Sequence, residues 1–440
     1  LGAAATAVRA AEIKPARHGS ITPNASEFLV DLVANDGRDQ TTALQAAIDT
    51  AAEKDVPIVL PPGKFIVSDL RLRAGTRLIG MARATTLFYS GGAAFLTADK
   101  ADGLVLDGLT LDGAYKVFDA GRGDGLITLG NSKNIHLTNL GIRNSVGIGL
   151  SLVECGGRIE YVSISNVLDA GLKSLDSLGL DIIGNTITEC ANNGILVWRS
   201  KQEEDGSVVS GNRISKIRNA AGGTGEYGNG INVFRAGSVL VSANRICDCS
   251  YTAVRGNASS NIQIVGNSCE RLGEVALYAE FGFQGALIAN NIVDTAASGI
   301  SVTNFNDGGR LAVVQGNLIR NLFRREQEPE DKRGEGIGVE ADAVVIGNTI
   351  ENAPTVGIQI GWGSYMRDVA VTGNVIRQAR VGISVTNAPD SGKCLIANNL
   401  ISGAKDGAIR EMNLGVMTGP DLVRETGASD RIQATANVAI

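Results

Sequence analysis

The chain has 440 residues, of which 56 are Gly, 9 are Pro and 4% are aromatic, and its formal net charge is −6. This acidic balance lacks the global positive field of proteins that bind nucleic-acid backbones. No apolar run approaches the roughly 18 residues that a membrane-spanning helix requires. Frequent Asn-x-Ile and Asn-x-Val phrases beside many Gly residues are typical of short strands joined by tight turns. We therefore expect an all-β protein with no nucleic-acid partner and no membrane insertion.

The first residues, LGAAATAVRAAE, are small and apolar, and Ala5-Thr6-Ala7 fits an A-x-A cleavage site. They predict the remainder of an export signal within residues 1–20, and hence a periplasmic or secreted protein. An Ala-rich terminus without such a role is the alternative.

A helix is predicted next, within TTALQAAIDTAAEK, because apolar residues recur at 44, 47, 48 and 51 in a helical rhythm. Thr41 and Thr42 are its possible N-caps. A strand and a Pro-Pro-Gly turn follow. A stack of strands would present unpaired edges at its end, so we expect this helix to cover that end, with residues 21–95 forming the cap and the first coils.

From residue 96 to residue 413 the sequence repeats with a period near 23. Gly-Asn-x-Ile phrases place their Asn at 185, 212, 244, 267, 290, 317, 348, 374 and 398, and Gly-Ile-x-Val phrases alternate with them. Each unit holds three short runs of alternating character, which predicts three strands per turn of a solenoid. We expect a single-stranded, right-handed parallel β-helix of about 12 coils, with residues 414–440 as a C-terminal tail or cap.

The motif residues are expected to build the scaffold. Asn tolerates left-handed geometry at a sharp turn, and its amide can bond both the backbone and the Asn of the next coil in a ladder. Asp107 and Asp112 are expected at turns, with a calcium site as the less favoured alternative. The six Cys residues have no metal-type pairing with His18 or His136, so we expect buried free thiols, no metal and no cofactor.

Several phrases resemble a known family. Asp39-x-Thr41 with ALQAAID, IVLPPGKFIV and LIGM looks like the entry segment of pectate-lyase-like right-handed β-helix proteins, and the repeats match that superfamily's pattern over roughly residues 35–413. The tail DGAIREMNLGVMTGPDLV is similar to a bacterial family of twin-arginine-exported repeat proteins without an assigned activity. The first resemblance implies the fold and the second implies export, but neither implies a reaction.

Two pairs of insertions interrupt the period on either side of four regular strands, which begin at 230, 253, 276 and 299. The insertions are 199–207 with 216–229, and 304–310 with 320–335. Long loops on a rigid scaffold often carry function. We predict a cleft with these strands as its floor, about 15–20 Å long at the ~4.8 Å strand spacing, which suits a short stretch of linear polymer. The charge run RREQEPEDKR is expected to form a solvated wall loop.

The alternation of inward and outward side chains along a strand predicts which residues line this floor. If the Ile and Val of Gly-Ile-x-Val point inward, the second and fourth residues after the Gly point outward. These columns mix aromatic rings with amide, hydroxyl and charged groups, a set that fits sugar recognition. The substrate-binding candidates are Trp198, Asn232, Phe234, Asn257, Ser301, Thr303 and Glu340. Ordinary surface residues are the alternative, with Trp198 and Phe234 packed under the inserted loops.

Arg255, Tyr278 and Glu280 are the catalytic candidates. Arg255 would bind a uronate carboxylate through its planar fork, and Tyr278 would transfer a proton once the cation lowers its pKa. This pair predicts elimination or epimerisation beside a carboxylate. Hydrolysis would instead use two carboxyl groups, either Glu280 with Glu340 or one supplied by a wall glutamate such as Glu226 or Glu335.

The predicted function is that of an exported carbohydrate-active protein, namely a polysaccharide lyase or another uronate-acting enzyme. A glycoside hydrolase on the same face and a non-catalytic glycan-binding or cell-envelope protein are the alternatives. The outward rungs lack the Asp clusters of calcium-dependent pectate lyases and of polygalacturonases, so the resemblance transfers no catalytic residues. The expected partner is a polysaccharide or oligosaccharide, and the oligomeric state stays open.

Overall fold

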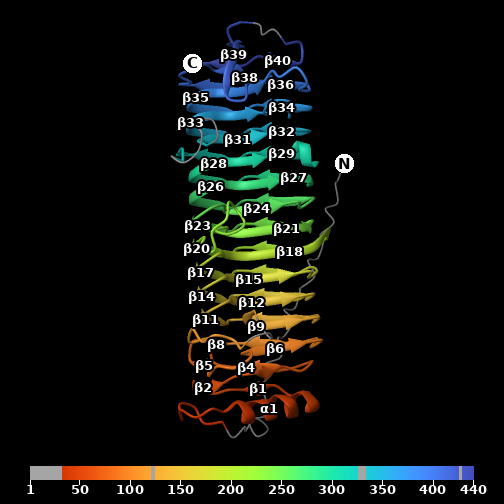
Figure 1. Ribbon diagram of the computed structural model, residues 1–440, viewed down its shortest axis with the longest axis vertical. Helices are drawn as coiled ribbons and strands as arrows, with labels where there is room; N and C mark the ends of the chain where they lie inside the picture. Colours follow the sequence, from red (N-terminus) through yellow and green to blue (C-terminus); the bar gives the residue numbers. More distant parts are fainter. Residues whose placement is uncertain (1–31, 120–123, 326–332, 426–428) are drawn as a thin grey trace, which may run out of the picture.

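The computed structural model describes residues 32–119, 124–325, 333–425 and 429–440, so the predicted export signal lies outside the described residues. Figure 1 shows one column of stacked strands, with α1 (Thr41–Lys54) at one end and the C-terminal strands at the other. Strands recur in a fixed order around the column and pair in parallel with the next turn, which confirms a parallel β-helix. It has about 14 turns rather than the expected 12, because the first two turns, with the strands Leu70–Arg71 and Leu96–Asp99, lack a Gly-Ile-x-Val phrase.

Sheet 1 is a 15-stranded sheet that forms one face of the column. Its strands, in spatial order, are β1 (Ile58–Val59), β4 (Arg77–Ile79), β7 (Val105–Asp107), β10 (Ile135–Thr138), β13 (Gly157–Glu160), β16 (Asp181–Ile183), β19 (Val208–Ser210), β22 (Leu240–Ser242), β25 (Ile262–Val265), β27 (Gln284–Ala289), β29 (Arg310–Gln315), β32 (Ala343–Ile346), β34 (Val369–Thr372), β36 (Cys394–Ala397) and β40 (Ile432–Thr435).

Sheet 2 follows sheet 1 in each turn, after the motif Asn. Its separate strands are β2 (Gly63–Val67), β5 (Thr85–Tyr89), β8 (Leu109–Asp112), β11 (Gly141–Ser145), β14 (Ser163–Val167), β17 (Thr186–Cys190), β20 (Arg213–Ile217), β23 (Arg245–Cys249), β30 (Leu318–Arg320), β37 (Leu400–Ser402) and β41 (Val438–Ala439).

Sheet 3 holds the Gly-Ile-x-Val strands. They are β3 (Leu70–Arg71), β6 (Leu96–Asp99), β9 (Gly125–Gly130), β12 (Ile148–Val153), β15 (Ala170–Leu175), β18 (Asn193–Glu204), β21 (Ile231–Gly237), β24 (Val254–Asn257), β31 (Glu335–Val339) and β38 (Ile409–Asn413), with β39 (Val416–Asp421) antiparallel to β38. Four long strands run through both sheets 2 and 3, namely β26 (Ser268–Glu280), β28 (Ile292–Val302), β33 (Thr349–Ile360) and β35 (Val375–Thr386).

Helix α1 covers the first turn as predicted, and buries Leu44, Ile48 and Ala51 against it. Its start differs from the expectation that Thr41 or Thr42 is the cap. Gln40 is the N-cap residue without a side-chain cap bond, and the Asp39 carboxylate accepts the Thr41 backbone N–H at 2.9 Å. No helix in the described part of the chain has the length and apolar character needed to cross a membrane.

A ladder of buried Asn side chains joins successive turns between sheets 1 and 2. In each, Nδ2 donates to a backbone carbonyl of the preceding turn and to Oδ1 of the next Asn, as Asn267 does with Val241 and Asn291. The predicted positions 290 and 398 are wrong by one residue, because Asn291 and Asn399 hold those rungs. The left-handed residue is the one before the ladder Asn, such as Gly266 (φ 68°), since that position makes the turn.

The Ile and Val side chains of all three sheets fill one continuous core. Ile187, Ile195 and Val197 are among its fully buried members. All six Cys residues are free, and five of them are buried as expected, whereas Cys247 is only half-buried because it lies at an outward position of β23. Within the predicted C-terminal segment, β40 and β41 pair with β36 and β37 and so add a further turn to the column.

Candidate functional site

The predicted floor lies on sheet 3 in the predicted register. Cα partners align Leu196, Asn232, Arg255, Tyr278 and Ser301 on successive strands. A second column aligns Trp198, Phe234, Asn257 and Glu280. Thr303 and Glu340 lie one residue beyond the ends of β28 and β31.

Arg255 is the centre of a buried ion network on this floor. Its Nε donates to Oε1 of Glu280 at 2.6 Å, and its Nη1 lies 3.5 Å from Oε2 of Glu274. The exposed fractions of the three side chains are 12% for Arg255, 6% for Glu274 and 3% for Glu280. Of the predicted catalytic residues, Glu280 is therefore buried and Arg255 and Tyr278 are only partly exposed, so the floor is less open than we expected.

A glycine-rich segment, residues 218–229, covers Arg255; we call it the cover. The carbonyl of Gly225 accepts Nη1 of Arg255 at 2.9 Å and Nδ2 of Asn229 at 3.0 Å. The hydroxyl of Tyr251 donates to the carbonyl of Gly223 at 3.0 Å. Gly225 has φ +140°, and a Cβ there would lie 2.0 Å from Nη1 of Arg255, so only glycine fits. The second insertion of the first predicted wall thus folds over Arg255, whereas the first insertion mostly continues strand β18 to Glu204.

Glu274 is a site residue that the sequence analysis missed. Its Oε2 accepts the hydroxyl of Thr252 at 3.3 Å, and its Oε1 lies 3.4 Å from Nη2 of Arg333. Glu274 comes just before a degenerate Gly-Ile-x-Val phrase. The two outward columns contain only residues that follow the first position of each phrase, so they did not include it. The strand entrances gave no direct signal, because Asn193, Asn229, Thr252 and Ser298 are polar but the aligned residue in this turn is Val275, and Glu274 lies one residue before it.

Burial governs the protonation of the central side chains. It raises the pKa of Glu280 above the ordinary value of 4.5, although Arg255 and Asn257 act in the opposite direction. The Nδ2 of Asn257 donates to Oε1 of Glu280 at 2.9 Å. Burial also raises the pKa of Tyr278, and the charge of Glu280 adds to this effect. The expectation that Arg255 lowers the pKa of Tyr278 overall is therefore wrong, because burial outweighs the cation.

At the β18 end of the floor the aromatic side chains pack together. The rings of Trp198 and Phe234 are 6.0 Å apart and nearly perpendicular, and the guanidinium of Arg235 lies 4.6 Å from the Phe234 ring. Trp198 also packs on the buried cluster that contains Leu196. Both rings stay partly exposed. Asn232 is buried, and its Oδ1 has no hydrogen-bond partner among the described residues.

At the opposite end of the floor, Glu340 bonds to residues 304–310, the first insertion of the second predicted wall. Its Oε2 accepts the backbone N–H of Phe305, at the start of the short 3-10 helix η1 (Phe305–Asp307), at 2.7 Å. Burial raises the pKa of Glu340. Ser301 and Thr303 are half-buried. Residues 326–332 of the second wall, with most of its charge run, lie outside the described residues.

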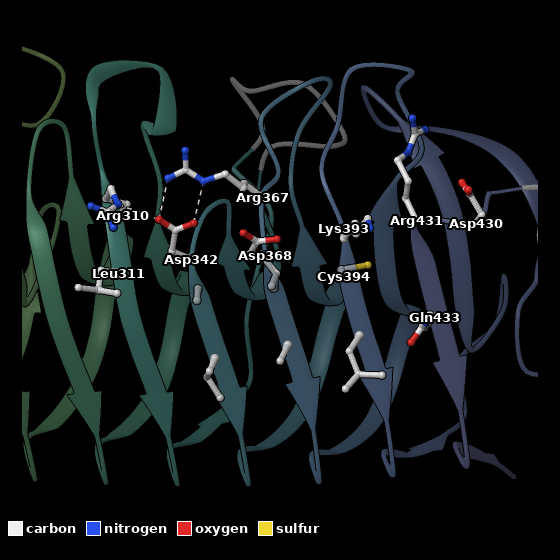
Figure 2. A pocket seen from close by; sticks show the side chains of 15 residues that line it. Arg310, Leu311, Asp342, Arg367, Asp368, Lys393, Cys394, Asp430, Arg431 and Gln433 are labelled. Atoms are coloured by element: carbon white, nitrogen blue, oxygen red, sulfur yellow. Dashed lines mark hydrogen bonds and ion pairs between the residues drawn. The ribbon is translucent and has the colours of Figure 1, made fainter.

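A separate groove of about 1050 Å³ lies at the entrance to the last strands of sheet 1. Figure 2 shows charges of both signs along it. Asp342 accepts Nε of Arg310 at 2.7 Å and Nε of Arg367 at 2.8 Å, and these bonds lower its pKa to about 2. The network links three successive turns, so we interpret it as a clamp on the C-terminal part of the column.

Comparison with known proteins agrees with this architecture. A family model described as "Right handed beta helix region" matches residues 203–376. The chain is a right-handed parallel β-helix. This confirms the right-handed β-helix fold predicted from the repeats, whereas the resemblances to the pectate-lyase-like superfamily and to the twin-arginine-exported family stay predictions.

Solved structures share the fold of this β-helix at low sequence identity. The pre-mature gene product 12 of bacteriophage phi29 is 13% identical with a TM-score of 0.56; the match covers 88% of this chain but only 56% of that one. The catalytic unit of the GH87 alpha-1,3-glucanase from Streptomyces thermodiastaticus is 15% identical with a TM-score of 0.51, over 95% of this chain and 69% of that one. No curated protein matches the sequence significantly.

Proposed function

We propose that this β-helix is a glycoside hydrolase whose reacting carboxyl groups are Glu280 and Glu274. The observation that carries the proposal is that both glutamates contact one guanidinium, that of Arg255, beneath the cover. Hydrolysis of a glycosidic bond uses two carboxyl groups that differ in protonation. Glu280 and Glu274 supply two carboxyl groups, and half-buried sugar-binding candidates lie beside them.

The two glutamates have different roles in this proposal. Burial raises the pKa of Glu280, which favours a protonated carboxyl that can donate to the leaving oxygen. Glu274 faces Arg255, Arg333 and the Thr252 hydroxyl, which are the partners of a carboxylate that serves as base or nucleophile. Arg255 positions both carboxyl groups.

The contacts of Arg255 favour hydrolysis over uronate chemistry. Its Nε and Nη1 already serve Glu280, Glu274 and the carbonyl of Gly225. A substrate carboxylate that bound through two of the guanidinium nitrogens would have to displace one of these acceptors. Tyr278, the partner proposed for elimination, has a raised pKa, so less of it is present as the phenolate base at neutral pH.

Substrate access requires the cover to move. Four of its residues, Gly222, Gly223, Gly225 and Gly228, have positive φ values, and few other residues adopt this conformation. A segment of this kind has many alternative conformations available. Lifting it would expose the ion network beside Trp198, Phe234, Asn257, Ser301 and Thr303, which we propose as sugar contacts. Export would bring the enzyme to polymeric substrates.

The fold is compatible with this activity, since an alpha-1,3-glucanase shares it. The test incubates the protein with α-1,3-glucan, laminarin, xylan and mannan, and with polygalacturonate and alginate. New reducing ends without ultraviolet absorbance from unsaturated products are expected on a neutral polymer. Glu280→Gln and Glu274→Gln should each abolish this signal, and Glu189→Gln, at an exposed pair with Lys216, should leave it unchanged.

Two outcomes would contradict the hydrolase. Unsaturated products from a uronate polymer would establish a lyase on the same floor. Retention of a glycan with no product from any polymer would establish a binding protein instead.

A further inference from the structure

A groove of about 470 Å³ lies on sheet 2, near the N-terminal end of the column and on a different face from Glu280. Four adjacent strands, β5, β8, β11 and β14, form its floor. At ~4.8 Å per strand the floor spans about 14 Å, the length of a few sugar units. The polar side chains that line it are mostly uncharged, namely Thr86, Thr110, Asn139, Ser163 and Ser165, with Arg83 and Arg143 at its sides.

Gly141 makes the centre of this floor hollow. It pairs with Thr110 on one side and with Ser163 on the other, in the outward column of the sheet. A Cβ at Gly141 would lie 3.2 Å from Oγ1 of Thr110, so any longer side chain would fill the space between the two hydroxyl groups. The missing side chain leaves both hydroxyls accessible from the groove.

Tyr161 forms one side of the groove and occupies an unusual position. Its φ is 55°, and it lies in the tight turn that precedes sheet 2. The equivalent residues in the next two coils of the column are Gly184 and Gly211. Bulky residues rarely adopt this left-handed conformation. The side chain is 62% exposed, so core packing does not explain its presence. Its ring lies beside Gly184, where a Cβ would be 3.1 Å from Cε1. Unfavourable backbone geometry thus presents an exposed aromatic ring to the groove, which points to a binding role.

The charges of the groove argue against an acidic ligand. Nε of Arg143 donates to Oδ2 of Asp112 at 2.9 Å, so this cation is already paired. Arg83 lies at the exposed rim. The remaining polar groups are hydroxyls and one amide, which donate to and accept from sugar hydroxyls.

We infer that this groove is a second carbohydrate site, which binds a neutral oligosaccharide. The ring of Tyr161 stacks on the apolar face of a pyranose, while Thr110 and Ser163 bond its hydroxyl groups in the hollow over Gly141. The site is independent of the proposed hydrolase centre. It would hold a polymer on the column whether or not Glu280 is catalytic.

The test measures retention in gels that contain laminarin, starch, xylan or mannan, with polygalacturonate as the acidic comparison. Glu280→Gln is the background, so that no polymer is degraded. We expect at least one neutral polymer to be retained, with Tyr161→Ala weakening binding about tenfold through loss of the stacking ring. Gly141→Leu should weaken binding by filling the hollow, while Tyr161→Trp should retain it.

Tyr115→Ala is the matched control, because Tyr115 is also exposed, at 49%, and also left-handed, with φ 53°, but does not line the groove. Circular dichroism of each variant checks that the fold persists. Three results would overturn the inference: no neutral polymer is retained, only polygalacturonate is retained, or Tyr161→Ala and Gly141→Leu bind like the background protein.

Discussion

Arg255 and Glu280 lie on adjacent strands of sheet 3, and Nε of Arg255 donates to Oε1 of Glu280 across 2.6 Å. The same guanidinium reaches Glu274 and the carbonyl of Gly225, so one side chain joins the floor, the second carboxyl group and the cover. A change at Arg255 should therefore affect both stability and the protonation of its neighbours.

Removal of Arg255 should destabilise the protein strongly. Arg255→Met leaves two buried carboxyl groups without their shared cation, for which we expect a loss of about 3–5 kcal/mol in the free energy of unfolding. The double variant with Glu280→Leu should recover part of this loss, because it removes one of the uncompensated groups. Chemical denaturation of both single variants and the double variant completes the cycle. Arg271→Met, at an exposed pair with Asp248, should have a small effect; additive losses would show that Arg255 and Glu280 are not coupled.

Ionisation of Glu280 should oppose folding. Since its pKa in the folded protein is raised above 4.5, the folded state holds this proton more tightly than the unfolded chain does. The contribution of Glu280 to stability therefore falls as the pH rises from 4.5 through the raised pKa. Glu280→Gln cannot ionise, so its stability relative to the wild type should increase over this range. Unfolding curves at several pH values measure the difference, and a difference that stays constant with pH would refute the assignment.

The pH profile of catalysis provides a separate test of Glu280. A general acid must be protonated, so kcat/KM on a neutral glycan should fall as the pH rises through the raised pKa of Glu280. Arg255→Lys keeps the charge but loses the fixed fork that holds both carboxyl groups, and should shift this alkaline limb. An unshifted limb in Arg255→Lys would assign it to another group.

The Asn ladder should be sensitive to single substitutions. Asn267→Ala leaves the buried Asn244 N–H and the Val241 carbonyl without their partners, which should cost about 2–4 kcal/mol in the free energy of unfolding. Asn306 is exposed and bonded to its neighbour Asp307, so Asn306→Ala is the control. Equal losses in thermal or chemical unfolding would show that the ladder adds no stability beyond that of a surface amide.

The clamp in Figure 2 should weaken in acid. Arg310 and Arg367 lower the pKa of Asp342 to about 2, so its stabilising effect is complete above the ordinary pKa of 3.8 and is lost as the pH falls toward 2. Asp342→Asn should lower the free energy of unfolding by about 1 kcal/mol at pH 7, after allowance for solvent screening. The free energy of unfolding of this variant should change less between pH 4 and pH 2 than that of the wild type. Parallel acid titrations of the two proteins, followed by circular dichroism, would contradict the clamp if their curves coincided.

Local pattern was sufficient for the scaffold. The alternation in Gly-Ile-x-Val predicted which residues of sheet 3 point inward, and Ile195 and Val197 are fully buried. The period near 23 predicted the stacking, so the alignment of Arg255 with Tyr278 followed from counting. Where two Asn residues are adjacent, as at 290 and 291, counting chose the wrong one, because Asn290 is the left-handed residue of the turn and Asn291 follows it in the ladder.

The environment of the floor did not follow from local pattern. Gly225 reaches Arg255 across 30 residues of sequence, and Arg333 reaches Glu274 across 59. Such contacts depend on the path of each long insertion, which has no period to constrain it. The repeat thus predicted the fold and the position of each side chain on its strand, because every turn supplies the same local geometry. Burial of Arg255, the raised pKa of Glu280 and the pairing with Glu274 arose where non-repeating segments fold back over the sheet.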